Sequence, residues 1–189
     1  MKKTIGVLAL QGAVSEHLAA IQKAGAEAIP VKHPDQLGAL DGLILPGGES
    51  TTMRRFIKHY DFAEPLRSFH QAGKGIFGTC AGMVLAAQET DSGEESLGLI
   101  DAKVVRNGFG RQKESFEAAL TIQGISGGPF QAVFIRAPYL EQLGGNIEVL
   151  AKVEEKVVAA RQEKVLVTAF HPELTDDLRL LEHFIRECV

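Results

Sequence analysis

The sequence predicts an α/β protein with a three-layer fold: a mostly parallel central sheet, helices on both of its faces and additional antiparallel strands. Short, nearly continuous apolar runs alternate with amphipathic segments over residues 1–90, which is typical of parallel strands covered on both faces. Apolar runs without helical spacing follow over residues 102–158, which favours antiparallel pairing there. The length of 189 residues suits a single domain spanning residues 1–189.

The first half of the chain contains alternating predicted strands and helices. The strand at 28–31 is expected near an edge of the sheet, because Pro30 cannot donate a ladder hydrogen bond. Glycines at positions 25 and 73 end two of the helices. The strands are predicted at 4–10, 28–31, 42–45 and 75–78, and the helices at 15–24, 51–60, 64–72 and 83–87.

The second half is predicted to be rich in strands and to end in a helix. Residues 91–96 are acidic and predict a loop. The last helix is expected to open near residues 175–177, where Thr-Asp-Asp supplies a cap and acids for the first turn. Strands are predicted at 102–105, 118–122, 132–135, 147–150, 157–161 and 165–170.

Composition argues against several classes of protein. The formal net charge is −4 and no dense block of Lys and Arg occurs, which disfavours nucleic acid as the main partner. The apolar run after the N-terminus is broken at Gln11-Gly12, well before the length of a signal peptide or membrane span. We therefore expect a cytoplasmic protein, in which Cys80 and Cys188 form no structural disulfide.

Cys80 is the leading candidate for a catalytic residue. It lies in Gly78-Thr79-Cys80-Ala81-Gly82, between an apolar strand and a helix-forming run. A tight strand-to-helix turn exposes a side chain to attack, and the free N–H groups of the helix favour a thiolate. The alternative is a free cysteine buried for packing, which is common in proteins.

His171-Pro172-Glu173 follows the predicted strand at 165–170 and supplies a base and a carboxylate. If this segment is extended, His171 and Glu173 point to the same side, and Pro172 stiffens the link between them. The alternative is a histidine that merely ends a strand in solvent. Together with Cys80, the pair predicts a Cys-His-Glu enzyme of acyl transfer.

A glycine loop, Gly47-Gly48-Glu49-Ser50, follows the strand at 42–45. Ligands of open α/β sheets bind beyond the carboxyl ends of the strands, so this loop is expected to meet Cys80 and His171. The backbone N–H groups of Gly48 and Ala81 are predicted to form an oxyanion hole. The alternatives are an ordinary turn or a phosphate loop, but the spacing of nucleotide-binding glycine motifs is absent.

Several blocks of the sequence resemble class I glutamine amidotransferases, in particular members that supply ammonia for pyridoxal 5'-phosphate synthesis. The resemblance covers almost the whole chain, and only Gly108 and Tyr139 depart from the expected pattern. The blocks are residues 10–12, 45–52, 78–82, 106–107, 109–112, 134–138 and 170–175.

The resemblance implies that Cys80 attacks the side-chain amide of L-glutamine, His171 passes a proton to the departing ammonia, and Glu173 orients His171. It implies no cofactor and no metal. An arginine is a suitable partner for the α-carboxylate of glutamine, although an ordinary surface role is the alternative for each arginine. The implied glutamine contacts are Gly48, Glu49, Ser50, Arg106, Ile135 and Arg136.

The resemblance also implies a partner, a separate pyridoxal 5'-phosphate synthase subunit of barrel type, in a large hetero-oligomeric complex. That subunit receives ammonia through an internal channel and combines it with a pentose phosphate and a triose phosphate. Candidate docking surfaces are the Gln11-Gly12 turn and the helix at 51–60, with Arg54, Arg55 and Lys58. A solvated charged face is the alternative for that helix.

Three other functions remain open from the sequence. The chain could be the glutaminase subunit of a different amidotransferase, such as one serving histidine or anthranilate synthesis. A stress-type hydrolase or chaperone also carries a cysteine on a similar turn, but the segment from His171 to Glu173 favours the amidotransferase. The chain could also be a non-catalytic binding module of the same fold.

Overall fold

The computed structural model describes residues 1–189, and its strands form one ten-stranded sheet and a separate two-stranded hairpin. Five strands run parallel at one side of the large sheet. In spatial order these are β2 (Glu27–Val31), β1 (Thr4–Leu8), β3 (Gly42–Leu45), β4 (Gly75–Thr79) and β12 (Val165–Thr168). Every residue of β3, β4 and β12 is buried, as strands covered on both faces require.

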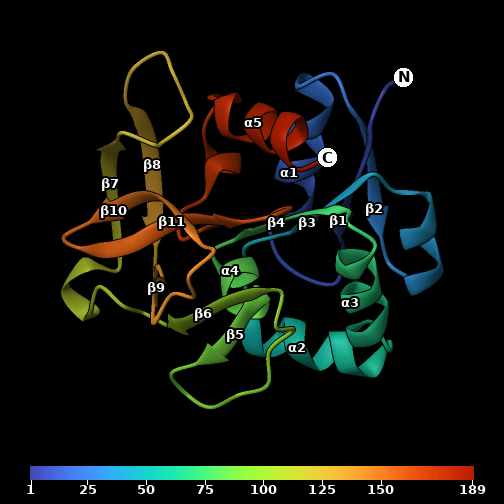
Figure 1. Ribbon diagram of the computed structural model, residues 1–189, viewed down its shortest axis with the longest axis horizontal. Coiled ribbons are helices and arrows are strands. Elements are labelled where there is room, and N and C mark those ends of the chain that lie inside the picture. The colour runs from blue at the N-terminus through green and yellow to red at the C-terminus, as the bar shows by residue number, and fades with distance from the viewer.

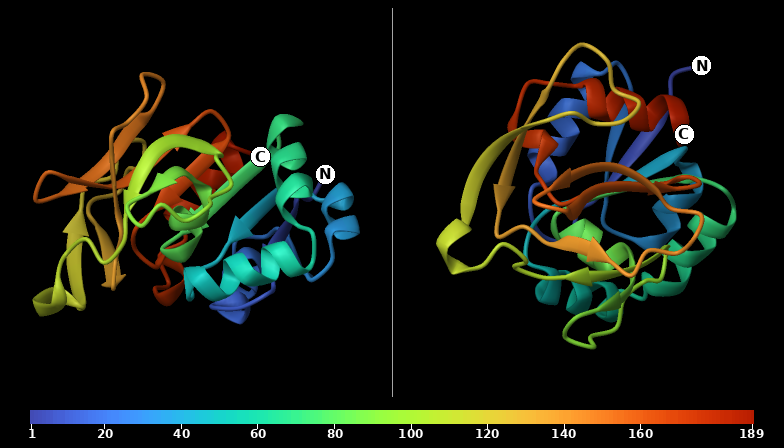
Figure 2. Two further views of the ribbon diagram at one scale, coloured as in Figure 1. Left: turned by 90° about the horizontal axis from the view of Figure 1, so that it is seen from below. Right: turned by 60° about the vertical axis from the view of Figure 1, so that its left-hand side comes forward.

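Helices cover both faces of the parallel strands (Figure 1), which confirms the predicted layers. On one face lie α1 (Val14–Lys23) and α5 (Arg179–Glu187); on the other lie α2 (Ser50–His59), α3 (Ala63–Gln71) and α4 (Ala81–Ala86). Figure 2 shows the same arrangement from two further sides. The helices are short, and none has the length and the apolar run needed to cross a membrane.

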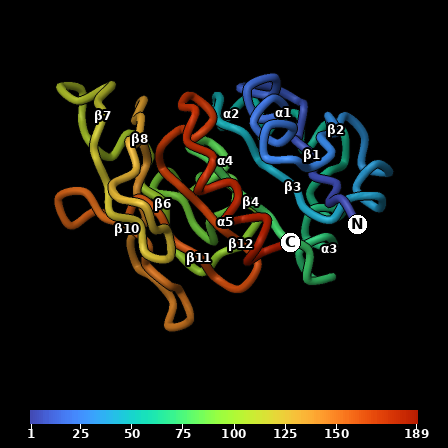
Figure 3. Tube along the Cα trace, turned by 90° about the horizontal axis from the view of Figure 1, so that it is seen from above, coloured from blue at the N-terminus to red at the C-terminus, as the bar shows by residue number.

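The remaining strands extend the sheet beyond β12, and their pairings are antiparallel, as predicted for this region, except that β5 pairs with β6 in parallel. In order these are β11 (Lys156–Gln162), β9 (Tyr139–Glu141), β6 (Ile100–Val105) and β5 (Ala87–Thr90), and β10 (Glu148–Val153) also pairs with β11. The hairpin of β7 (Ser115–Leu120) and β8 (Phe130–Ile135) lies at the opposite end of the molecule from β2 (Figure 3). One contiguous cluster of buried apolar side chains joins the two regions.

Two predicted features of the first half are confirmed. β2, which contains Pro30, is an edge strand of the sheet, as expected for a residue without an N–H. The apolar segment before Cys80 is β4, and its neighbours β3 and β12 pair with it in parallel. The ends of these strands therefore lie at one edge, where the predicted site residues follow them.

Other predictions were wrong in their boundaries. The strands β5 and β9 were not predicted, and the helix expected at 83–87 spans Ala81–Ala86 and is followed by β5, which begins at Ala87. The last helix begins at Arg179 rather than near residues 175–177. Asp177 still receives a hydrogen bond from the N–H of Arg179 (3.1 Å), so the acid acts just before the helix rather than inside its first turn. Three short 3-10 segments complete the chain: η1 (Pro34–Ala39), η2 (Arg111–Lys113) and η3 (Pro172–Leu174).

Candidate active site

Cys80 lies at a sharp turn between β4 and α4 and has an unusual backbone conformation. Its φ of 51° and ψ of −103° lie in a region that side chains other than glycine rarely occupy. The flanking glycines make this turn sterically feasible. A Cβ atom at Gly78 would lie 2.6 Å from the carbonyl oxygen of Gly82, and one at Gly82 would lie 2.8 Å from the carbonyl carbon of Leu45. Steric crowding at positions 78 and 82 thus explains why glycines flank Cys80.

His171 and Glu173 form a close pair beyond the end of β12. Nδ1 of His171 lies 2.6 Å from Oε1 of Glu173, and both side chains are largely buried. The N–H of His171 donates to the carbonyl of Val133 (2.9 Å) in β8, which fixes the backbone. The contact forms, but the expected extended geometry was wrong. Glu173 lies in η3, a 3-10 turn that opens at Pro172.

The charge state of this pair depends on its burial and its partners. Burial alone lowers the pKa of His171, but hydrogen bonds and charges of Cys80 and Glu173 raise it to about 10. Burial raises the pKa of the Glu173 carboxyl, but the hydrogen bond and the charge of His171 bring it below its usual value. The pair therefore favours an imidazolium beside an ionised carboxylate.

The glycine loop after β3 brings Cys80 and His171 together in space. A Cβ atom at Gly47 would lie 2.8 Å from Nδ1 of His171 and 3.6 Å from Cβ of Cys80. On another side, Sγ of Cys80 lies 3.7 Å from the carbonyl oxygen of Ile135. Segments far apart in sequence thus surround the thiol, and Gly47 leaves room for the imidazole ring.

The two N–H groups predicted for the oxyanion hole lie in suitable environments. The N–H of Gly48 donates to no protein group, and Ala81 is the first residue of α4, where a helix leaves its N–H groups free. Next to Gly48, Oε1 of Gln11 accepts the N–H of Glu49 (2.9 Å). A Cβ atom at Gly48 would overlap that oxygen, so this position also needs glycine.

Glu49 and Ser50, which the resemblance implied as glutamine contacts, lie at the start of α2. The Glu49 carboxylate accepts the N–H groups of Thr51 (3.0 Å) and Thr52 (2.7 Å) and the Thr52 hydroxyl (2.6 Å). The hydroxyl bond of Thr52 is the main reason that the pKa of Glu49 falls to about 2. Ser50 is buried as the first residue of α2. The Glu49 side chain is therefore occupied as a helix cap.

The two predicted arginines differ in their surroundings. Nη1 of Arg106 lies 2.9 Å from Oε2 of Glu94, and its Nε lies 3.7 Å from Asp91. The acidic segment predicted as a loop thus holds the Arg106 guanidinium. Arg136 forms no ion pair. It follows Ile135 with a φ of 47° and lines a cavity of about 340 Å³ together with Arg111.

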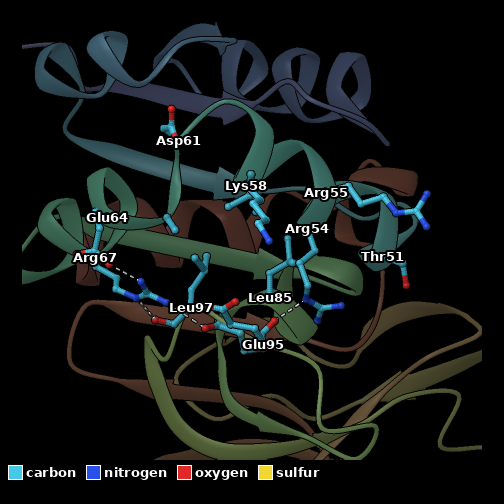
Figure 4. A pocket seen from close by; sticks show the side chains of 13 residues that line it. Thr51, Arg54, Arg55, Lys58, Asp61, Glu64, Arg67, Leu85, Glu95 and Leu97 are labelled. Carbon is cyan, nitrogen blue, oxygen red and sulfur yellow. Dashed lines mark hydrogen bonds and ion pairs between the residues drawn. The ribbon is translucent and has the colours of Figure 1, made fainter.

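A second cavity lies away from Cys80, between α2, α3 and residues 95–97 (Figure 4). Its volume is about 520 Å³, and neither Cys80 nor His171 lines it. The predicted docking residues Arg54, Arg55 and Lys58 all line this cavity, and Nη1 of Arg54 also forms an ion pair with Glu94 (3.0 Å). Because Glu94 also binds Arg106, one carboxylate connects α2 to a predicted glutamine contact.

Sequence reasoning missed one buried residue beside the triad candidates, His17 in α1. Its Nε2 lies 3.2 Å from Oγ1 of Thr79 and 3.5 Å from Oε2 of Glu173. The sequence signal that could have identified His17 as buried is its spacing from Ile21. His17 precedes Ile21 by four residues, so it lies on the same buried face of the helix.

The two positions that depart from the expected pattern contact each other. A Cβ atom at Gly108 would lie 2.5 Å from Cε1 of Tyr139, so the tyrosine ring fills the space that a side chain at position 108 would need. Gly108 is also held by a hydrogen bond from its N–H to the carbonyl of Ala137 (3.0 Å). The two departures therefore fit each other, because the small residue at position 108 leaves room for the tyrosine ring at position 139.

No group of three or more His, Cys, Asp or Glu side chains is arranged to hold a metal ion.

Comparisons with known proteins identify the relatives of this chain. It is 60% identical over 187 residues to the pyridoxal 5'-phosphate synthase subunit PdxT of Listeria innocua, covering 99% of this chain and all of that protein. It is 61% identical over the same length to the PdxT of Listeria welshimeri, with the same coverage. A crystal structure of a glutamine amidotransferase superposes with a TM-score of 0.92 at 44% identity, covering 97% of this chain and 98% of that one.

The family model of the SNO glutamine amidotransferases matches residues 7–189, which includes every residue of the candidate site described above. This chain therefore belongs to the SNO glutamine amidotransferase family.

Proposed function

We propose that this protein is the glutaminase subunit of a pyridoxal 5'-phosphate synthase. It hydrolyses L-glutamine to L-glutamate and ammonia and delivers the ammonia to a separate synthase subunit. The observation that carries this proposal is the strained Cys80 turn beside the buried pair of His171 and Glu173. The full-length similarity to PdxT proteins supports the specific pathway.

Acylation begins with the Cys80 thiolate, whose proton resides on His171. Sγ attacks the side-chain carbonyl carbon of glutamine, and the tetrahedral oxyanion accepts hydrogen bonds from the N–H groups of Gly48 and Ala81. His171 then donates its proton to the amide nitrogen, the carbon–nitrogen bond breaks, and ammonia leaves. The product is a glutamyl thioester on Cys80.

Deacylation regenerates the enzyme with the same groups. His171, now neutral, removes a proton from water, and the resulting hydroxide attacks the thioester carbonyl. The carbon–sulfur bond breaks, glutamate leaves, and the proton returns to the pair of Cys80 and His171. Glu173 keeps Nδ1 of His171 protonated and its ring oriented throughout, a supporting role.

Glutamine recognition uses backbone and charged groups around the thiol. Gly48, Glu49 and Ser50 contribute through their backbone, because the Glu49 side chain is occupied as the cap of α2. Ile135 contributes through its backbone carbonyl group, which lies beside Sγ of Cys80. Arg106 and Arg136 supply cations for the α-carboxylate. Arg106 is held for this task by Asp91 and Glu94.

The partner is a synthase subunit of barrel type, joined with this chain in a large hetero-oligomeric complex in the cytoplasm. Free ammonia largely protonates near neutral pH and then is no nucleophile, so transfer through an internal channel preserves its reactivity. The Gln11-Gly12 turn contacts the glycine loop through Gln11 and Glu49. Docking at this turn would act directly on the oxyanion hole.

The test measures ammonia release from glutamine by the purified chain, alone and mixed with the candidate synthase subunit. We expect release to rise on mixing and to be abolished in Cys80→Ala, because this variant lacks the thiol that forms the thioester in the proposed mechanism. Undiminished release by that variant rejects Cys80 as the nucleophile. Co-purification with a partner other than such a synthase indicates a different amidotransferase, and no release with any partner indicates a non-catalytic binding module.

A further inference from the structure

We propose that His17 is a positioning residue for the glutaminase reaction and that it holds Glu173 from the side opposite His171. The inference rests on the proposed function and adds a fourth side chain to the three that carry the chemistry. In this arrangement Oε1 of Glu173 orients His171 and Oε2 is held by His17. The carboxylate then cannot rotate away from the imidazole that it supports.

The geometry places His17 at the free oxygen of Glu173. Oε1 of Glu173 lies 2.6 Å from Nδ1 of His171, whereas Oε2 is buried and has no hydrogen bond. Nε2 of His17 lies 3.5 Å from that oxygen, at the outer limit of a hydrogen bond. A small rotation of either side chain makes the bond. An unsatisfied buried carboxylate oxygen is costly, which favours that rotation.

The charged groups around His17 favour a neutral imidazole that donates from Nε2. Glu173 and His171 face the ring from the end of β12, and Glu16 is its neighbour on α1. Burial lowers the pKa of His17 and outweighs the opposing effect of Glu173. A neutral ring has one N–H group, and with the proton on Nε2 this group can donate either to the Thr79 hydroxyl or, after the small rotation, to the Glu173 carboxylate.

The fold holds His17 rigidly in this place. Its helix, α1, begins directly after the Gln11-Gly12 turn and packs on β1, β2 and η3. Thr79, its second neighbour, precedes Cys80 in β4. His17 therefore contacts the strand that carries the nucleophile and the segment that carries the carboxylate. It can fix their relative position without touching glutamine.

The first test is kinetic and uses the chain in complex with its synthase subunit. His17→Leu keeps the volume and removes the donor, and we expect kcat for glutamine hydrolysis to fall about 10-fold, as for one lost buried hydrogen bond. KM should be unchanged. His17→Gln, which can place an amide N–H near Glu173, should restore most of kcat. His183→Leu is the matched control, because His183 is also a buried histidine in a helix.

Two further readouts separate positioning from a merely structural role. In His17→Leu the acid limb of the kcat/KM profile should move to higher pH, since a Glu173 that lacks a second donor protonates more readily. In a Glu173→Gln background, the His17→Leu substitution should have almost no further effect on kcat. A His17→Leu enzyme with an unchanged profile and wild-type kcat would overturn the inference, as would full additivity of the two substitutions.

The second test does not depend on activity. Nitrogen-15 NMR of the six histidines in the wild-type chain should show that the ring of His17 stays neutral, with its proton on Nε2, between about pH 6 and pH 8 around the reference value of histidine. The signal is assigned to His17 by its loss in His17→Gln. A proton on Nδ1 refutes the positioning role. Absence of glutaminase activity in wild type would instead refute the proposed function and leave this result standing.

Discussion

The strained backbone of Cys80 predicts that glycine at this position is more stabilising than alanine. A non-glycine residue in such a conformation costs about 1–3 kcal/mol, and φ of 51° with ψ of −103° is an uncommon combination even among positive-φ residues. Cys80→Gly removes the Cβ atom that causes the strain. Cys80→Ala keeps it. Both variants lose the thiol and its contact with Ile135, so their comparison isolates the strain.

The magnitude follows from two opposing effects. Relief of strain stabilises Cys80→Gly relative to Cys80→Ala by about 1–3 kcal/mol, and the greater freedom of glycine in the unfolded chain costs about 0.5–1 kcal/mol. At the centres of these two ranges, about 2 and about 0.75 kcal/mol, the net gain is about 1.2 kcal/mol. At about 2–4 °C per kcal/mol for a chain of this length, the glycine variant should melt roughly 2–5 °C higher.

The assay is thermal and urea unfolding of both variants, with Cys188 as the matched control site. Cys188 is also buried, but its φ of −112° and ψ of −25° carry no such strain. At position 188, glycine should therefore be less stable than alanine by about 0.5–1 kcal/mol. If Cys80→Gly is no more stable than Cys80→Ala, or if the two sites respond alike, the strain argument is refuted.

Three more substitutions test other contacts. Gly47→Ala adds a Cβ atom that overlaps the His171 ring, so ammonia release should be lost while circular dichroism still reports a folded chain; wild-type release would contradict the close approach. Glu49→Ala should destabilise the protein by about 1 kcal/mol at neutral pH. Because the pKa of Glu49 is about 2 in the folded chain, below its unfolded value, this difference should shrink as pH falls from about 5 to about 2, and a pH-independent difference in urea unfolding would contradict it. Gly108→Ala should cost about 1–3 kcal/mol, and much less when Tyr139→Ala is also present; additive costs would exclude the fit between these two positions.

The parallel part of the fold could be predicted from the sequence because its signals are local. The continuous apolar runs of β3 and β4 reflect burial on both faces, and Pro30 marked the edge strand. β5 could not be predicted, because Ala87 continues the helix-forming run of α4. The strand forms there through parallel pairing with β6, a tertiary contact without a local signal.

The candidate site was predictable where a residue type and a turn coincide, as at Cys80 and in the segment from His171 to Glu173. It was not predictable where a role depends on distant partners. Nothing in the sequence around Arg106 indicates its ion pairs with Asp91 and Glu94, because these two residues lie on another segment. The role of His17 could not be predicted for the same reason, because its distance to Glu173 is set by the packing of α1.

The position of β12 has a consequence for the synthesis and folding of the chain. This strand lies between β4 and β11 and places Thr168 opposite Thr79, a pairing between residues 89 positions apart. Closing so long a loop is entropically costly and slow compared with local contacts. A ribosome-bound chain that has reached only β4 and α4 contains Cys80 but neither His171 nor Glu173. If these three residues form the proposed triad, glutamine cleavage begins only after β12 has completed the centre of the sheet.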